Sequence, residues 1–341
     1  TVFLVSMIPT LWLLLCLAEG SGILPDGPLN GTVGGTIVFT TTLTPAESQF
    51  SSIEWKFGQK RIFFGYGTNT TAPEYEDRIT LMSAGSLELR NLSLTDSGQY
   101  TVNMVTNAFL NGTTRLDVYE RISGTSVTPS TNLPIEGNSV NLTCEAAGSV
   151  FSRMWMKDGS ALNLSDNMNL YEQNSVLSFN TLDKRDSGEY SCRVSNPISA
   201  EVAQYTLAVN YGPENVQIKG PAEIQFGQTL TLSCSAESRP SASYKWALNG
   251  TLIEGQNSSL LTKAIRYLSD SGNYICHAVN FVTDRSSAAT HRLSITEKTP
   301  GCTAGCIVGI VLACLVILGG VCGGAVNKSV CMNVCMCKEL R

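Results

Sequence analysis

Short runs in which apolar and polar residues alternate with a period of two recur along residues 21–297. In one run the apolar positions are Leu142 and Cys144, and in another they are Leu232 and Cys234. Alternation of this kind places every second side chain on the buried face of a half-exposed β-strand. The pattern therefore predicts an all-β fold for this part of the chain.

The first of two continuous apolar runs, residues 2–18, leads into small residues at positions 18 and 20. Small residues there are typical of a signal-peptidase site, so we predict a signal peptide at 1–20. An N-terminal membrane anchor is the alternative, but the run is short and Pro9 interrupts it. Because Thr1 begins the chain and no basic residues precede the run, we expect the first residues of the leader to be missing.

The second apolar run, 306–326, has 21 residues without a charge. At about 1.5 Å per residue a helix of this length matches the roughly 30 Å core of a bilayer. Lys328, Lys338 and Arg341 follow and favour a cytosolic C-terminus. We predict a type I single-pass protein of the plasma membrane, with a stalk at 298–305 and a tail at 327–341. A GPI-anchor signal is the alternative, although such signals usually end in the apolar run.

One motif, Asp-Ser-Gly-x-Tyr, occurs three times in the outer region, beginning at Asp96, Asp186 and Asp270. Each copy has one tryptophan upstream: Trp55, Trp155 and Trp246. In the second and third copies a Cys follows the Tyr by two residues, and another Cys precedes the Trp. The Cys…Trp…Tyr-x-Cys spacing is the signature of immunoglobulin-like sandwiches. We predict three in tandem, one V-type (21–120) and two C2/I-type (121–211 and 212–297).

The first repeat departs from the pattern, because Thr41 and Val102 occupy its two Cys positions. We predict that this domain has no disulfide and that the bridges are Cys144–Cys192 and Cys234–Cys276. The interval from Trp55 to Val102 is 47 residues, against 37 and 30 in the other repeats. The extra length fits the C′ and C″ strands of a V-type domain. Arg78 and Asp96 are placed to pair across the bottom of this sandwich; the alternative is two unrelated surface charges.

Composition argues against catalysis and nucleic-acid binding. The net charge is −5, with no basic field, and only two His residues are present. No nucleophile motif or metal-ligand cluster occurs, so we predict no enzyme activity and no cofactor. The three Asp-Ser-Gly copies resemble a protease motif, but their repetition at strand corners favours a structural role.

Two modifications are expected from local motifs. Three tail cysteines are candidates for lipidation beside the membrane rather than for a metal site: Cys331, Cys335 and Cys337. Eight Asn-x-Ser/Thr sequons precede the apolar run and are predicted glycosylation sites: Asn30, Asn69, Asn91, Asn111, Asn141, Asn163, Asn249 and Asn257. Asn327 also matches but lies on the cytosolic side and should stay unmodified.

Several segments make the outer region resemble the carcinoembryonic-antigen-related cell adhesion molecules. They are Asn-Pro-Ile-Ser-Ala at 196–200, Leu-Ala-Val-Asn-Tyr-Gly-Pro at 207–213 and Tyr-Lys-Trp-Ala-Leu-Asn-Gly-Thr at 244–251, with Tyr-Thr-Val at 100–102 and Leu-Asp-Val-Tyr at 116–119. The resemblance implies adhesion through the GFCC′ sheet of the V-type domain, to a second copy or a relative. An immune decoy or pathogen-binding receptor, using the same face for a foreign ligand, is the alternative.

Strand alternation gives the expected outward residues of that sheet: Lys56, Ile62, Phe64, Asn103 and Val105. This assignment takes Gly65 as the start of the turn after strand C′. Lys56 departs from the family, which usually has an aromatic residue there. The tail contains no Tyr, so any signalling would pass through a membrane partner.

Small residues recur every four positions at the start of the predicted span, at Gly301, Gly305, Gly309 and Ala313. Small residues let membrane helices approach closely, so we predict a lateral dimer through this stripe. The alternative is that glycine is simply frequent in membrane helices.

Overall fold

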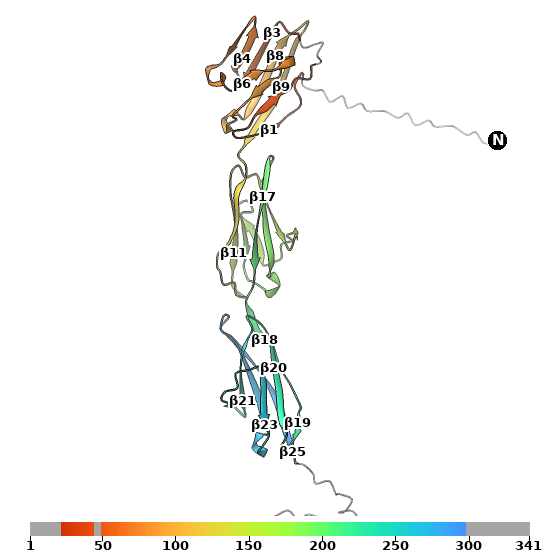
Figure 1. The fold of residues 1–341 in the computed structure, drawn as a ribbon, viewed down its shortest axis with the longest axis vertical. Helices are drawn as coiled ribbons and strands as arrows, with labels where there is room; N and C mark the ends of the chain where they lie inside the picture. Colours follow the sequence, from red (N-terminus) through yellow and green to blue (C-terminus); the bar gives the residue numbers. More distant parts are fainter. Residues whose placement is uncertain (1–21, 44–48, 298–341) are drawn as a thin grey trace, which may run out of the picture. The chain divides into compact units, whose positions relative to one another are not determined.

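The computed structural model describes residues 22–43 and 49–297 of this chain (Figure 1). In this part the chain is all-β, with five 3₁₀ helices of three residues each and no α-helix. None of its helices is long and apolar enough to cross a membrane. The predicted signal peptide, stalk, membrane span and tail lie outside the described residues. Contacts divide the chain into two compact units, one up to Tyr211 with Ser238–Pro240 and one comprising the rest.

The first sandwich packs a six-stranded sheet against a three-stranded one. In spatial order the larger sheet comprises β1 (Leu29–Thr32), β9 (Phe109–Tyr119), β8 (Gly98–Val105), β3 (Ser52–Phe57), β4 (Lys60–Tyr66) and β5 (Thr68–Thr71). The smaller comprises β2 (Ile37–Phe39), β7 (Leu87–Leu89) and β6 (Ile79–Leu81). Three 3₁₀ turns connect strands: η1 (Pro73–Tyr75), η2 (Ser83–Gly85) and η3 (Leu94–Asp96).

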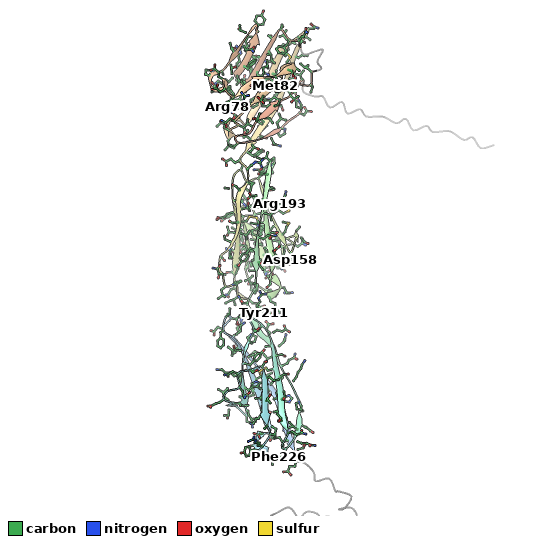
Figure 2. The ribbon with its side chains drawn as sticks, in the orientation of Figure 1. Arg78, Met82, Asp158, Arg193, Tyr211 and Phe226 are labelled. Atoms are coloured by element: carbon green, nitrogen blue, oxygen red, sulfur yellow. A yellow bond between two sulfur atoms is a disulfide. The ribbon has the colours of Figure 1, made fainter. Side chains whose placement is uncertain are left out.

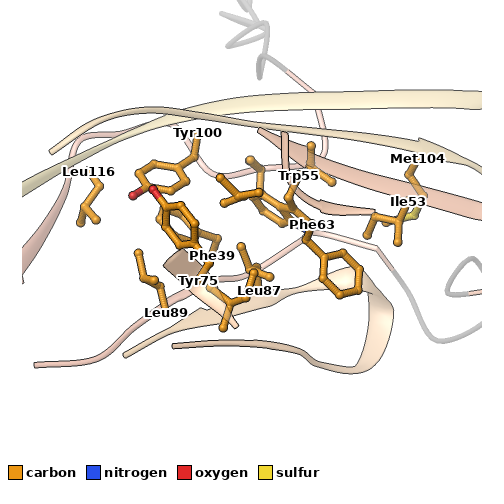
Figure 3. Close-up of a cluster of buried hydrophobic side chains, with 14 of the residues drawn as sticks. Phe39, Ile53, Trp55, Phe63, Tyr75, Leu87, Leu89, Tyr100, Met104 and Leu116 are labelled. Atoms are coloured by element: carbon orange, nitrogen blue, oxygen red, sulfur yellow. The ribbon is translucent and has the colours of Figure 1, made fainter. Parts of the chain in front are cut away.

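The core of this sandwich is built from the alternating positions that the sequence marks as apolar (Figure 3). Trp55 is fully buried, and its indole Nε1 donates a 3.1 Å hydrogen bond to the carbonyl of Gly85. Phe39 stacks on Tyr100 with ring centroids 4.4 Å apart. Such aromatic pairs add about 1 kcal/mol beyond the burial of their area. Packing of this kind stabilises a domain that contains no disulfide among its described residues.

Thr41 occupies one of the two Cys positions and is buried. Its hydroxyl donates a 2.6 Å hydrogen bond to the carbonyl of Ala84, and its backbone N–H donates to Ser86 Oγ at 3.0 Å. The buried polar atoms of Thr41 are therefore satisfied by the β6–β7 connection of its own sheet, as burial requires. Val102 occupies the other Cys position and is fully buried.

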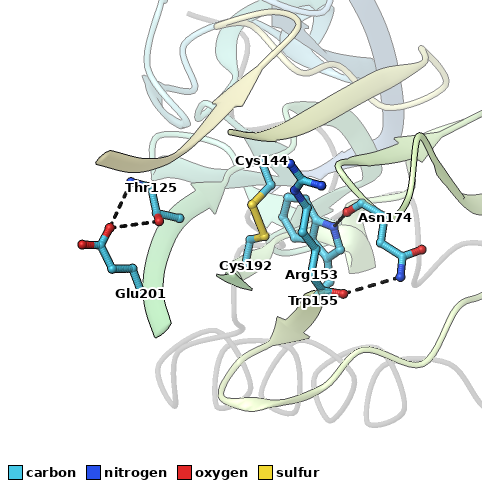
Figure 4. Close-up of a disulfide and its surroundings, with 7 residues drawn as sticks. All are labelled: Thr125, Cys144, Arg153, Trp155, Asn174, Cys192 and Glu201. Atoms are coloured by element: carbon cyan, nitrogen blue, oxygen red, sulfur yellow. Dashed lines mark hydrogen bonds between the residues drawn. A yellow bond between two sulfur atoms is a disulfide. The ribbon is translucent and has the colours of Figure 1, made fainter. Parts of the chain in front are cut away.

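The second sandwich packs two four-stranded sheets. One comprises β10 (Ser123–Pro129), β11 (Val140–Ala147), β15 (Val176–Phe179) and β14 (Met168–Tyr171). The other comprises β13 (Ser160–Ala161), β12 (Ser152–Lys157), β16 (Gly188–Asn196) and β17 (Ser199–Leu207), and η4 (Lys184–Asp186) precedes β16. The predicted Cys144–Cys192 bridge is present and joins the two sheets beside Trp155 (Figure 4).

The third sandwich packs a three-stranded sheet against a five-stranded one. The smaller comprises β18 (Tyr211–Lys219), β20 (Thr229–Arg239) and β23 (Leu260–Ala264). The larger comprises β19 (Glu223–Gln225), β25 (Arg285–Thr296), β24 (Gly272–Asn280), β21 (Ser243–Leu248) and β22 (Thr251–Leu252), and η5 (Leu268–Asp270) precedes β24. The predicted bridge between Cys234 and Cys276 is present here too.

The Asp-Ser-Gly-x-Tyr repeats form the same corner in all three sandwiches. The tyrosine hydroxyl donates to the carbonyl of the aspartate four residues earlier, at 2.8–2.9 Å in each copy. In the first sandwich the Asp96 carboxylate, 3% exposed, also accepts from the guanidinium of Arg78, labelled in Figure 2. The predicted pair of Arg78 and Asp96 is thus confirmed. The motif is structural, as its repetition indicates.

Candidate functional site

The outer face of the first sandwich is the solvent side of β9, β8, β3 and β4, which correspond to strands G, F, C and C′. We call this surface the outer face. Its side chains come from the positions that alternate with the buried Trp55 and Val102. Because neighbouring strands pair in register, these side chains form straight rows across the sheet.

The central row runs through four strands. Asn111 on β9 lies opposite Asn103 on β8, and Asn103 lies opposite Glu54 on β3. Glu54 in turn lies opposite Phe64 on β4. Three strand spacings make this row about 14 Å long.

Glu54 is the hub of the outer face. Its carboxylate accepts from Arg61 Nε at 2.6 Å and from Asn103 Nδ2 at 3.3 Å, and it lies 3.1 Å from Lys56 Nζ. Partial burial raises the pKa of Glu54, but the bonds from Arg61, Lys56 and Asn103 outweigh it and hold the pKa below its usual value of 4.5. The carboxylate is therefore ionised at neutral pH and fixes three neighbouring side chains.

The next row pairs Thr113 with Thr101, Thr101 with Lys56, and Lys56 with Arg61. The two threonine hydroxyls lie 3.3 Å apart. The guanidinium of Arg61 lies 4.9 Å from the ring centroid of Phe64, which is cation–π geometry. Phe64, half-buried, is thus held in place by the hub.

Apolar side chains gather at one end of the outer face. Val105 and Phe109 pair across β8 and β9 and are 39% and 66% exposed. Tyr66, 68% exposed, ends β4 beside the Ile53–Gly65 pair at the same end of the sheet. Aromatic groups next to satisfied charges are typical of protein interfaces.

One predicted contact residue is wrong. Ile62 was expected to face outward, but it is fully buried. The ladder between β3 and β4 shifts register between Trp55 and Lys56, so a β-bulge at Ile62 places both Ile62 and Phe63 inside. The assumed turn at Gly65 is also wrong: β4 continues to Tyr66, and the left-handed residue is Gly67, with φ +68°.

The other four predicted residues face solvent. Lys56, Phe64 and Asn103 are half-buried on the outer face, and Val105 is exposed. The register brings Lys56, Phe64 and Asn103 together around Glu54. Sequence reasoning missed Arg61 and Phe109 as site residues, because only the register shows which neighbours they contact.

The remaining site predictions concern modification and metals. The eight sequon asparagines are all exposed. Their glycosylation stays a prediction. Cys331, Cys335 and Cys337 lie outside the described residues. Within residues 22–43 and 49–297, no group of three or more His, Cys, Asp or Glu is placed to hold a metal ion.

Comparisons with family models match three segments of the chain. Residues 25–119 match the immunoglobulin V-set domain. Residues 133–205 and 215–294 each match an immunoglobulin domain. The three matches coincide with the three sandwiches and their separate cores.

Solved structures that resemble this chain include proteins with tandem immunoglobulin domains. The full ectodomain (Ig1–Ig3) of mouse nectin-like molecule 4 is 20% identical, with a TM-score of 0.51, and the match covers 81% of this chain and 99% of that one. The match to the complex of Dpr2 Ig1-Ig2 with DIP-Theta Ig1-Ig3 has 20% sequence identity and a TM-score of 0.51, and it covers 81% of this chain and 98% of that one. The match to murine CEACAM1b has 24% sequence identity and a TM-score of 0.48, and it covers 53% of this chain and 96% of that one. At these identities the likeness shows the fold alone. From the matched segments and the three sandwiches, the chain belongs to the immunoglobulin superfamily, with one V-set domain and two further immunoglobulin domains.

Proposed function

We propose that this protein is a cell-surface recognition receptor that binds a second copy of itself, or a related immunoglobulin-superfamily protein, through the outer face. The observation that carries the proposal is the central row, where the ionised hub of Glu54 holds Arg61 and Asn103 in place beside Phe64. Side chains already fixed before binding lose little entropy on association. We also propose that this protein is a relative of the carcinoembryonic-antigen-related cell adhesion molecules, which it resembles in sequence.

The chemistry of the outer face suits a protein partner rather than a small ligand. It is a sheet surface with Phe64 beside the charged hub and with the rings of Phe109 and Tyr66 at one end. Arg and aromatic residues at the centre of an interface typically contribute most of its binding energy. A two-fold axis near the hub would let each row contact the same row of a second copy.

The proposal also includes attachment to the plasma membrane through 306–326 and lateral pairing through Gly301, Gly305, Gly309 and Ala313. Weak contacts between outer faces gain strength when two copies are held together, by about 100-fold or more where the geometry permits. Replacing Gly305 and Gly309 with Ile should reduce self-association of the span in a membrane reporter assay. An unchanged signal would remove lateral pairing from the proposal and leave the outer face untouched.

The experiment that tests the proposal is a binding screen of soluble residues 21–298 on beads. Beads carrying this segment are mixed with each other and with beads carrying related ectodomains. Aggregation that soluble residues 21–298 inhibit supports adhesion. Binding only to an unrelated or foreign protein would favour the decoy or pathogen-binding receptor.

A further inference from the structure

One predicted glycosylation site lies within the outer face itself. On β9 the even-numbered residues Gly112 and Thr114 are buried, whereas Asn111 and Thr113 face outward. Asn111 is exposed and lies directly opposite Asn103. Asn103 contacts the hub at Glu54. Asn111 is therefore the first residue of the central row.

The sequon Asn111-Gly112-Thr113 is complete, with Asn111 exposed and Thr113 half-buried on the outer face. An N-linked glycan is bulky and polar. The centre of a protein interface is close-packed and largely dry. A glycan at Asn111 and a partner over Phe64 would compete for a row about 14 Å long.

We propose that Asn111 carries an N-linked glycan that covers the outer face, so that binding belongs to the form without it. In the modification, the amide Nδ2 of Asn111 bonds to the first carbon of an oligosaccharide carried by a lipid pyrophosphate. The bond between that carbon and the pyrophosphate oxygen breaks, the lipid pyrophosphate leaves, and the amide loses one proton. Partial occupancy of this one site then sets the fraction of copies that can bind. The effect on binding rests on the proposed function, whereas the covering of the face does not.

Asn69 provides a matched comparison within the same sandwich. It lies on the edge strand β5, opposite Gly65. Gly65 is buried and pairs with the buried Ile53. Asn69 therefore belongs to the row of side chains on the core side of the sheet and not to a row of the outer face. A glycan at Asn69 should leave the central row open.

The test uses residues 21–298 secreted from a glycosylating cell, as wild type and with Asn111→Gln or Asn69→Gln. Thr113→Val, which removes the same sequon while keeping Asn111, guards against an effect of the Gln side chain. Peptide mass spectrometry measures occupancy. Lys56, in the neighbouring row, is then labelled with a small and with a polymer-linked amine reagent. The exposed Lys60, the first residue of β4, is the internal reference.

We expect Asn111 to be occupied in most but not all copies of the wild type. Asn111→Gln and Thr113→Val should raise polymer labelling of Lys56 relative to Lys60 severalfold, with small-reagent labelling unchanged and Asn69→Gln without effect. Self-association, measured by sedimentation velocity, should rise by about tenfold or more, the equivalent of recovering one good contact. The inference is overturned if Asn111 is bare in the wild type, or if Lys56 is equally accessible with and without the sequon. If Lys56 becomes accessible but no self-association appears, the covering glycan stands and binding to a second copy fails.

Discussion

The organisation of the outer face depends on Glu54. Three side chains bond to its carboxylate: Lys56 from the same strand, and Arg61 and Asn103 from the two neighbouring strands. Its carboxylate is the acceptor of the network, whereas Lys56, Arg61 and Asn103 are donors. Removing the acceptor would leave two cations side by side with no counter-charge between them. The order of Phe64 would then be lost, because Arg61 holds its ring.

The first residue-scale prediction concerns pH. The pKa of Glu54 in the folded protein is below its usual value of 4.5, so its stabilisation is present above the unfolded pKa and is lost as pH falls through the folded pKa. Binding through the outer face should therefore be unchanged from neutral pH down to the usual pKa of 4.5 and weaken as pH falls below it. Carbon NMR of labelled Glu carboxyls gives the titration directly. A Glu54 midpoint above 4.5 would contradict the network.

The second residue-scale prediction concerns Phe64. Phe64→Ala should weaken binding by about 30-fold or more, because it removes a central aromatic anchor, equivalent to about 2 kcal/mol. Thr80→Ala, exposed on β6 of the opposite sheet, is the control and should bind as wild type. Surface plasmon resonance of residues 21–298 measures both. Equal binding by the two variants would move the site off the outer face.

The third residue-scale prediction concerns the corner of the first sandwich. Arg78→Ala should destabilise this sandwich by about 3 kcal/mol, since it leaves the buried Asp96 carboxylate without its cation. We take the low end of the usual range because the Arg78 side chain is 24% exposed and Asp96 keeps its bond from Ser93 N. Arg90→Ala, which breaks the more exposed pair with Glu88, should change stability by less than about 1 kcal/mol. Hydrogen exchange of the β8 amides measures both, and equal effects would show that the corner pair contributes no more than a surface pair.

At the scale of elements, most of the fold could be predicted from the three sequence repeats. The Trp and the Tyr corner marked strands C and F, and the Cys pairs marked the bridge between the two sheets. Strand alternation correctly placed Lys56, Asn103 and Val105 outward. It failed at Ile62, because a bulge inserts one residue and reverses parity on one side of it. Bulges and register arise from pairing between strands. The row from Asn111 to Phe64 therefore could not be predicted from the alternation within any single strand.

The unequal distribution of disulfides yields a prediction at this scale. Each bridge closes a loop of 48 or 42 residues. The chain-entropy model gives about 4 kcal/mol for each. A reductant should therefore lower the stability of the second and third sandwiches and leave the first unchanged. Hydrogen exchange followed by mass spectrometry, with and without reductant, separates the three. Loss of protection in β8 at the same reductant concentration as in β16 would contradict the account.

At the scale of the whole molecule, the central claim is that the V-set domain is the binding module. Among the three sandwiches of the described residues, it alone has the six-stranded sheet with the strands β4 and β5 and the hub at Glu54. The second and third sandwiches carry the disulfides and should act as spacers. If the claim is correct, removal of the V-set domain should abolish binding.

The most direct measurement compares bead aggregation by residues 21–298 with that by the same segment lacking 21–120, each also with Asn111→Gln where that residue is present. The account predicts that the intact segment aggregates, more strongly with Asn111→Gln, and that the shortened segment does not. The shortened segment must retain its two disulfides by peptide mapping, so that loss of binding is not loss of fold. Aggregation by the shortened segment at the level of the intact one would contradict the account and assign binding to the second or third domain.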